Sequence, residues 1–235
     1  MVGQYGSEIN QGNKYRLSFT VGGLLLSQGR VLASMFMDFL GDDFPDSPND
    51  RRREVGKEIV SVRRQAIADN VLAYNAESTG KRVVSETLKR LSALTYAELS
   101  YLAGDESTYS ERQALMWVGM CRYYAFVGDF AREVVREHFL GREYSVSRAD
   151  YDSFVSQKAL WHPELGNLTE KTAGKLRSCL FQALREADFL DSSSDLMKPT
   201  YLGQRLLVLF VSRPESVEFF PAAVPDFPGL AGSES

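Results

Sequence analysis

The sequence predicts a mainly α, compact protein with helix-turn-helix-like parts and one short β-wing. Apolar residues recur every three or four positions through most of the chain, as they do on the buried side of an α-helix. Glycines and prolines separate these segments, and several begin with a Ser or Thr three residues before an acid, the spacing of a helix capping box. Only "DFLDSSSDLMKPTYL" has two short apolar steps around a Ser-rich turn, the pattern of a small hairpin or wing.

The first half of the chain is predicted to hold four helices, over 27–40, from Arg51 onward, over 81–94 and from Tyr96. The break over 41–50 has two prolines and four acids and is expected to be a loop. In the break "AESTG", Ser78 or Thr79 can cap the helix that follows. The predicted unit around this break is a helix, a short turn with a glycine, and a second helix.

The second half is predicted to hold four more helices, over 109–140, 148–160 and 169–187, and from Pro199 to 210. The first is too apolar for a surface helix, so we expect it to form the centre of the core, interrupted or bent near Gly128 and ended by Gly141. Ser147 and Asp150 have the capping-box spacing. Pro163 ends the helix that they begin, and Thr169 begins the next one.

We expect these elements to form three structural units between two flexible ends. The first residues are polar and rich in glycine, and the last are rich in proline and glycine. The predicted division is a flexible N-terminus over 1–14, a helix-turn-helix-like domain over 15–95, a helical core over 96–141, a winged-helix-like domain over 142–220 and a flexible tail over 221–235.

Length, charge and hydropathy exclude several classes of protein. A chain of 235 residues with a net charge of -4 has no uniformly basic coat, so contacts with nucleic acid would have to come from local patches. The longest apolar run, over 206–211, is far short of the roughly 18 residues of a transmembrane helix. The N-terminus also lacks the pattern of a secretory signal. We therefore expect a cytoplasmic protein with no membrane partner.

The predicted helix over 169–187 has an unusually uniform polar side. Five side chains recur along it at steps of four, three, four and three residues, which places them on one face. They are Lys171, Lys175, Ser178, Gln182 and Arg185. A helix followed by a Ser-rich hairpin is typical of a winged helix-turn-helix. We therefore predict that the two lysines, Gln182 and Arg185 contact DNA.

The predicted helix over 81–94 repeats this pattern, and the chain before it is basic. Its polar side holds Lys81, Arg82, Ser85 and Lys89, all of them predicted DNA contacts. Lys81 and Arg82 are expected in the first turn, the end that helix-turn-helix proteins insert into the major groove. Ten Lys or Arg stand against six Asp or Glu between 49 and 90, a local charge of +4. A cluster suited to phosphates completes the predicted site with Arg51, Arg52 and Arg53.

Both patterns can also be interpreted as ordinary solvent-exposed helix surfaces without a ligand. Lys and Arg opposite a row of leucines are what any solvated surface helix shows, and runs of charge are usually only hydrated. One such helix alone would favour that interpretation. Two of them, each after a short break, shift the balance toward a polyanionic ligand.

No pattern in the sequence indicates catalysis or a cofactor. A Gly-rich phosphate loop and a Gly-x-Ser-x-Gly elbow are both missing. Cys121 and Cys179 each stand alone in an apolar helical pattern, which predicts buried thiols and no metal site. His162 and Glu164 flank a proline without a nucleophile, so we prefer a local structural role. Core positions are predicted for Tyr101, Tyr109, Trp117, Tyr123, Tyr124 and Phe126. We expect no metal, cofactor, catalytic residue or small-molecule substrate.

Several separate stretches stand in an order and spacing that are specific to one family. They are "LSFTVGGLL", "NVLAYNAESTGKRVVSETLKRLSALTYAEL", "ALMWVGMCRYYAFVGDFAREVVREHFL", "DYDSFVSQKALWHPELGNLTEKTAGKLRSCLFQALREADFL" and "KPTYL". Together they span about 17–202, and on them the chain resembles the BrxA family of accessory proteins in BREX bacteriophage-defence systems. The acidic stretch over 41–53 and the tail after Phe220 depart from the family pattern.

The resemblance implies a compact, largely helical protein with helix-turn-helix-like parts that binds double-stranded DNA, and it makes other BREX proteins candidate partners. Together with the missing catalytic motifs, it favours a non-enzymatic accessory protein. It implies nothing for the two stretches that depart from the pattern. The alternative function is a protein-interaction scaffold that holds other defence components together through the central helices or the acidic loop.

Overall fold

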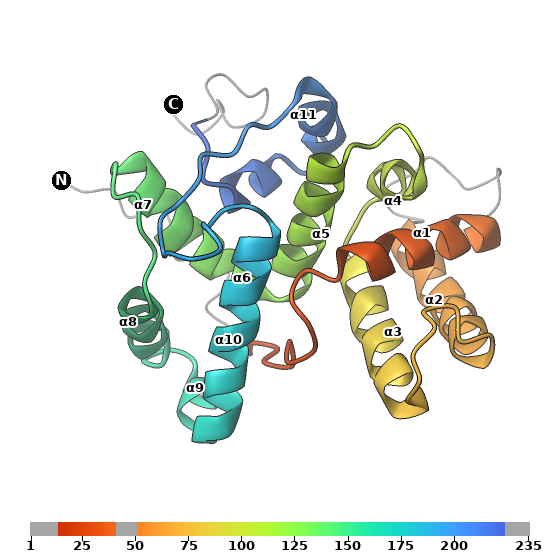
Figure 1. Ribbon diagram of the computed structural model, residues 1–235, viewed down its shortest axis with the longest axis horizontal. Coiled ribbons are helices and arrows are strands. Elements are labelled where there is room, and N and C mark those ends of the chain that lie inside the picture. The colour runs from red at the N-terminus through yellow and green to blue at the C-terminus, as the bar shows by residue number, and fades with distance from the viewer. Residues whose placement is uncertain (1–13, 41–50, 224–235) are drawn as a thin grey trace.

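The computed structural model describes residues 14–40 and 51–223, and this part of the chain is built from helices with two isolated β-bridges (Figure 1). The predicted mainly α, compact fold is confirmed. The α-helices are α1 (Leu26–Leu40), α2 (Arg51–Ala68), α3 (Glu77–Leu91), α4 (Tyr96–Ala103), α5 (Tyr109–Tyr123), α6 (Ala125–Phe130), α7 (Glu137–Leu140), α8 (Arg148–Lys158), α9 (Pro163–Gly166), α10 (Glu170–Glu186) and α11 (Gln204–Phe210). A π-helical segment, η1 (Ala131–Arg136), and a 3-10 helix, η2 (Pro214–Phe219), complete the order.

The helices α2, α3 and α4 all pack against α1 (Figure 1). Its apolar side buries Leu32 and Phe36 completely. On its far side α3 packs against the central helix α5. Gly119 of α5 makes this contact close, because a Cβ there would lie 2.8 Å from the carbonyl oxygen of Arg90. Only glycine allows the two backbones to approach so nearly.

The central helix α5 carries the middle of the core. All side chains over 113–121 are buried, which confirms the prediction of a central apolar helix. The break lies at Tyr124, whose extended backbone separates α5 from α6, and not at Gly128. Gly128 continues α6, where a Cβ would lie 2.9 Å from the carbonyl oxygen of Cys121. The interruption predicted near Gly128 therefore lies four residues earlier, at Tyr124, and the glycine itself serves close packing.

The remaining helices form the other side of the molecule. Leu176, Leu180 and Leu184 of α10 are completely buried. After α10 the chain folds back, and isolated antiparallel bridges join Leu190 to Met197 and Ser145 to Leu196. The described residues form no strand here, so the wing and the helix-turn-helix parts stay predictions.

Two helices begin elsewhere than predicted. α3 begins at Glu77, one turn before the predicted start at 81, because Gly80 is tolerated inside the helix and does not break it. Lys81 and Arg82 therefore lie in the second turn, and their expected place in the first turn is wrong. α11 begins at Gln204 and not at Pro199, since the chain between them is irregular and the Thr200 amide donates to the Pro221 carbonyl.

Local capping follows the sequence closely. Capping boxes are present at Thr95 with Glu98 and at Ser147 with Asp150, as predicted. Thr169 accepts a hydrogen bond from the Thr172 amide and caps α10. Pro163, predicted to end a helix, instead begins the short helix α9, where its fixed φ and missing N–H suit the first position.

The buried side chains form one continuous cluster from Tyr15 to Ala222. The predicted division into three units stays a prediction. Both cysteines are buried, as predicted. Of the six aromatic residues predicted in the core, the prediction is wrong for Tyr109. This residue is the first of α5, and its side chain is 68% exposed. None of the helices in the described ranges has the length and apolar character to cross a membrane.

His162 and Glu164 hold the segment before α1 in place. The Glu164 carboxylate accepts a hydrogen bond from the Tyr15 amide (2.6 Å) and lies 3.1 Å from Nδ1 of His162. The His162 ring stacks on Tyr15 with 3.7 Å between ring centroids. The pair is structural, as predicted, but the His162 side chain packs on the distant Tyr15 and does not cap the turn.

Candidate nucleic-acid interface

The polar side of α10 faces solvent along most of its length. Lys171, Lys175 and Gln182 are exposed, and the two lysines have no ion-pair partner among the described residues. Gln182 donates to Glu186 one turn later (2.7 Å). Arg185 is half-buried, and its guanidinium pairs with Asp195 of the following segment at 3.1 Å. The first half of this face is therefore an unpaired cationic surface, and the second half is bonded within the protein.

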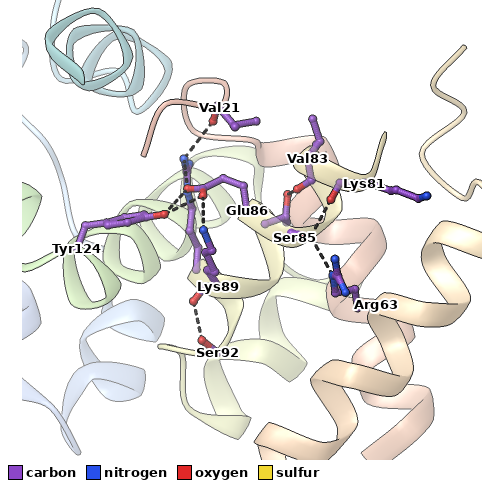
Figure 2. A network of polar contacts seen from close by, with 11 residues as sticks. Val21, Arg63, Lys81, Val83, Ser85, Glu86, Lys89, Ser92 and Tyr124 are labelled. Carbon is purple, nitrogen blue, oxygen red and sulfur yellow. Dashed lines mark hydrogen bonds and ion pairs between the residues drawn. The ribbon is translucent and has the colours of Figure 1, made fainter. Parts of the chain in front are cut away.

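More of the side chains on the polar side of α3 than on that of α10 are bonded to other groups of the protein. Lys81 pairs with Glu77 one turn earlier (2.6 Å), and this ammonium holds the pKa of the Glu77 carboxyl below its usual value. The Ser85 hydroxyl donates to the Lys81 carbonyl (2.7 Å) and accepts from Arg63 of α2 (2.9 Å) (Figure 2). Arg82 is exposed and has no ion pair within the described ranges. It is the most available cation on this helix.

One turn further along, α3 turns charged groups into the core. Glu86 and Arg90 are 2% and 0% exposed and form an ion pair at 3.1 Å, and Lys89 reaches Glu86 from outside at 3.5 Å. The Tyr124 hydroxyl donates to both oxygens of Glu86, at 2.7 and 2.9 Å (Figure 2). Burial, with the Glu86 charge beside it, raises the pKa of Tyr124 far above its usual value. This network is structural, because solvent does not reach it.

The chain over 14–25 links the two helices (Figure 1). The Arg90 guanidinium of α3 donates to the Gly23 carbonyl, and the next amide, that of Leu24, donates to Glu186 at the end of α10. In Figure 1 this segment crosses between α3 and α10, and both helices begin at the lower edge of the view. Their N-terminal ends, with Lys81 on one and Lys171 on the other, therefore lie at the same edge of the molecule.

The predicted arginine cluster cannot be placed on this surface. Arg51, Arg52 and Arg53 begin α2, but their side chains lie outside the described residues. Their role stays a prediction, as does DNA contact by every other predicted site residue. The acidic loop over 41–50 also lies outside the described residues.

Sequence reasoning missed three arginines that the fold brings to these surfaces. Arg63 reaches the polar side of α3 from α2. Arg148 and Arg177 stand with Arg185 around one cavity between α8 and α10. Arg177 is one residue away from the predicted face of α10, but Arg148 belongs to another helix. No periodicity within one helix can reveal a cluster that two helices share.

Comparison with known proteins identifies relatives of this chain. The model of the BrxA family matches residues 52–212. A BREX protein BrxA from Escherichia coli O9:H4 (strain HS) is 28% identical over 130 residues, which cover 54% of this chain and 59% of that protein. A BREX protein BrxA from Bacillus cereus (strain H3081.97) is 25% identical over 131 residues, which cover 55% and 64%. The matches thus span about three-fifths of these relatives.

A solved structure shares the fold. The crystal structure of an uncharacterized protein from Magnetospirillum magneticum superimposes with a TM-score of 0.70 at 17% sequence identity. The match covers 89% of this chain and 100% of that one, so the likeness extends to nearly the whole fold. Because the family model matches more than two thirds of the sequence, from α2 through the end of α11, this chain belongs to the BrxA family.

Proposed function

We propose that this protein is a non-enzymatic accessory protein of a BREX phage-defence system that binds double-stranded DNA, mainly through the phosphate backbone. The observation that carries the proposal is the pair of exposed cationic surfaces on α3 and α10, which begin at the same edge of the molecule (Figure 1). The BrxA relatives support the defence context, since both are named BREX proteins.

Phosphate contact fits the chemistry of these surfaces better than base readout. Lys171 and Lys175 are flexible point charges without partners in the described part of the chain, and such side chains follow phosphates without reading base edges. The net charge of -4 means that binding to a polyanion depends on local cationic surfaces such as these. Affinity should therefore fall steeply with salt and depend little on sequence.

The proposal is tested by charge reversal on α3. Lys81→Glu with Arg82→Glu should weaken binding to unrelated duplexes alike. It should also flatten the plot of log affinity against log salt by roughly one unit, since each lost phosphate contact removes about 0.9 and Lys81 is already paired with Glu77. Fluorescence anisotropy over a salt series measures both. The matched control is Arg142→Glu with Arg205→Glu, which makes the same charge change beyond α7 and on α11, away from the lower edge in Figure 1.

Two results separate failure of the residues from failure of the function. Unchanged affinity and salt slope in the α3 variant reject Lys81 and Arg82 as contacts. A wild-type protein that ignores every duplex at low ionic strength rejects DNA binding itself.

A protein-interaction scaffold is the second candidate function, and a pair of exposed apolar side chains favours it. Leu160 and Trp161, between α8 and α9, are 78% and 77% exposed. Large exposed apolar side chains next to each other are typical of contact sites for another protein. The middle of the central helix offers no such site, because its side chains over 113–121 are buried.

The two functions predict opposite results for one variant. Trp161→Ser should leave duplex affinity unchanged if DNA is the ligand of the α3 and α10 surfaces. A scaffold predicts that the same variant loses other BREX proteins in a pull-down after nuclease treatment.

A further inference from the structure

Three arginines line a small cavity between α8 and α10. Its walls are Arg148, from the first position of α8, and Arg177, Ser178, Phe181 and Arg185, from successive turns of α10. The cavity volume is about 180 Å³. Cavities for drug-sized ligands begin at about 300 Å³, so this one suits a single small group.

The guanidinium groups in this cavity have unused donors. Arg148 has no hydrogen-bond or ion-pair partner in the described part of the chain. Nε of Arg185 is buried and has no hydrogen-bond partner there, although Nη2 pairs with Asp195. Arg177 uses a single nitrogen, Nη1, for both oxygens of Asp152, at 2.9 and 3.0 Å. A buried N–H without an acceptor is unfavourable, and a ligand with several oxygen atoms would remove that penalty.

Among the side chains that line the cavity, the arginines are the donors with free hydrogens. The Ser178 hydroxyl already donates to the Gly174 carbonyl (2.8 Å), so its hydrogen is not free. Phe181 forms an apolar wall, and the Arg185 guanidinium carbon lies 5.8 Å from the centre of its ring. This contact fixes the guanidinium and leaves its edge open to a ligand.

The charges around the cavity do not balance. Three guanidinium groups stand against two carboxylates, those of Asp152 and Asp195. The side chains of these two acids are 59% and 46% exposed. Exposed ion pairs contribute little to stability, so these two carboxylates compete only weakly with a ligand of higher charge. An anion would complete the charge balance.

We propose that this cavity is a phosphate site, in which Arg148, Arg177 and Arg185 bind the oxygens of one phosphoryl group. Planar guanidinium forks match two phosphate oxygens at a time, which lysine cannot do. Two sources carry this group: the backbone of a duplex and a free phosphate compound. As a site for a DNA phosphate, the cavity rests on the DNA-binding function proposed above, whereas as a site for a free phosphate it stands alone.

The first measurement follows the Nε–H signal of Arg185 by ¹⁵N NMR, with the signal assigned by its loss in Arg185→Lys. Inorganic phosphate should shift this signal more than chloride does at equal ionic strength, and a short duplex should shift it as well. Arg148→Gln should weaken the response to both ligands by about tenfold, the loss expected for one charged hydrogen-bonding partner.

The second measurement compares duplex affinity over a salt series. Arg148→Gln should reduce the salt slope by about one phosphate contact. Arg205→Gln is the matched control, because it removes one exposed arginine from α11 and should change neither slope nor affinity. Circular dichroism confirms that both variants fold.

The outcomes distinguish this site from the DNA-binding function. Responses to both ligands, each weakened by Arg148→Gln, support a site for a backbone phosphate. A response to phosphate in a protein that binds no duplex supports a free-phosphate site and rejects the DNA function. Duplex binding that Arg148→Gln leaves intact, with no Arg185 response to either ligand, overturns the site and leaves the DNA function standing. No response and no duplex binding overturn both.

Discussion

The helices α3 and α10 have the same sequence pattern but use their charges differently. In α3, Glu86 and Arg90 are buried and bonded to each other, and Lys81 is paired with Glu77. In α10, Lys171 and Lys175 face solvent and have no ion pair among the described residues. The difference arises from position, because α3 packs between α1, α2 and α5.

This contrast shows why a basic helix face is ambiguous in a sequence. A Lys or Arg opposite leucines can hold a neighbouring helix, neutralise a nearby acid or remain free for a ligand. Only the packing of the helix decides among these. We therefore expect changes in α3 to alter mainly stability and changes in α10 to alter mainly binding.

The largest effect is expected inside α3. Arg90→Met leaves the buried Glu86 with only the half-exposed Lys89 as a cation, so it should lower the free energy of unfolding by about 3–5 kcal/mol. Urea unfolding measures this change. On the same helix the exposed control Arg82→Met should change stability by no more than about 0.5 kcal/mol. Equal effects of the two substitutions would show that the buried pair does not hold α3. Adding Glu86→Gln to Arg90→Met should recover part of the loss, because the uncompensated charge is gone.

The next effect compares binding by the two helices. Lys171→Gln with Lys175→Gln should reduce the salt slope of duplex binding by roughly two units, since both lysines are free to contact phosphates. Lys81→Gln with Arg82→Gln should reduce it by roughly one unit, because Lys81 is already paired with Glu77. Salt-titrated anisotropy of both variants decides the order. A larger loss on the α3 side would reverse the comparison.

The smallest effect comes from releasing Lys81. Because Lys81 lowers the pKa of Glu77, this carboxyl stays ionised at neutral pH, and the pair is lost only as the pH falls through that lowered pKa. Protonation therefore does not free Lys81 near pH 7, but Glu77→Gln does. The variant should bind duplexes more tightly by a few fold, with a salt slope steeper by about one unit. Unchanged binding would show that Lys81 makes no phosphate contact.

Much of the fold could be predicted because local signals determine helices. The capping boxes at Thr95 and Ser147 and the cap at Thr169 mark three helix starts correctly. Errors occurred where tertiary contacts override local preference. Gly80 and Gly128 both lie inside helices, Gly128 in close contact with the Cys121 carbonyl, whereas the chain after Pro199 is held by a backbone bond to Pro221.

The candidate site was only partly predictable. Exposure of Lys81, Arg82, Lys171 and Lys175 follows from helical periodicity, since each lies opposite an apolar row. The cavity with Arg148 does not, because it depends on how α8 approaches α10. The same limit applies to Arg90, whose burial depends on acceptors in the segment before α1.

The hydrogen bonds of Gly23 and Leu24 have a geometric consequence for any ligand that spans α3 and α10. Because neighbouring peptide groups of the segment over 14–25 bond to Arg90 and Glu186, at the C-terminal ends of the two helices, the spacing between these ends is set before a ligand arrives. A long, regular partner must then match this preset spacing, and no rearrangement of the protein is needed to receive it. A substitution in the segment over 14–25 that shifts these hydrogen bonds would change that match without altering the charges on α3 and α10.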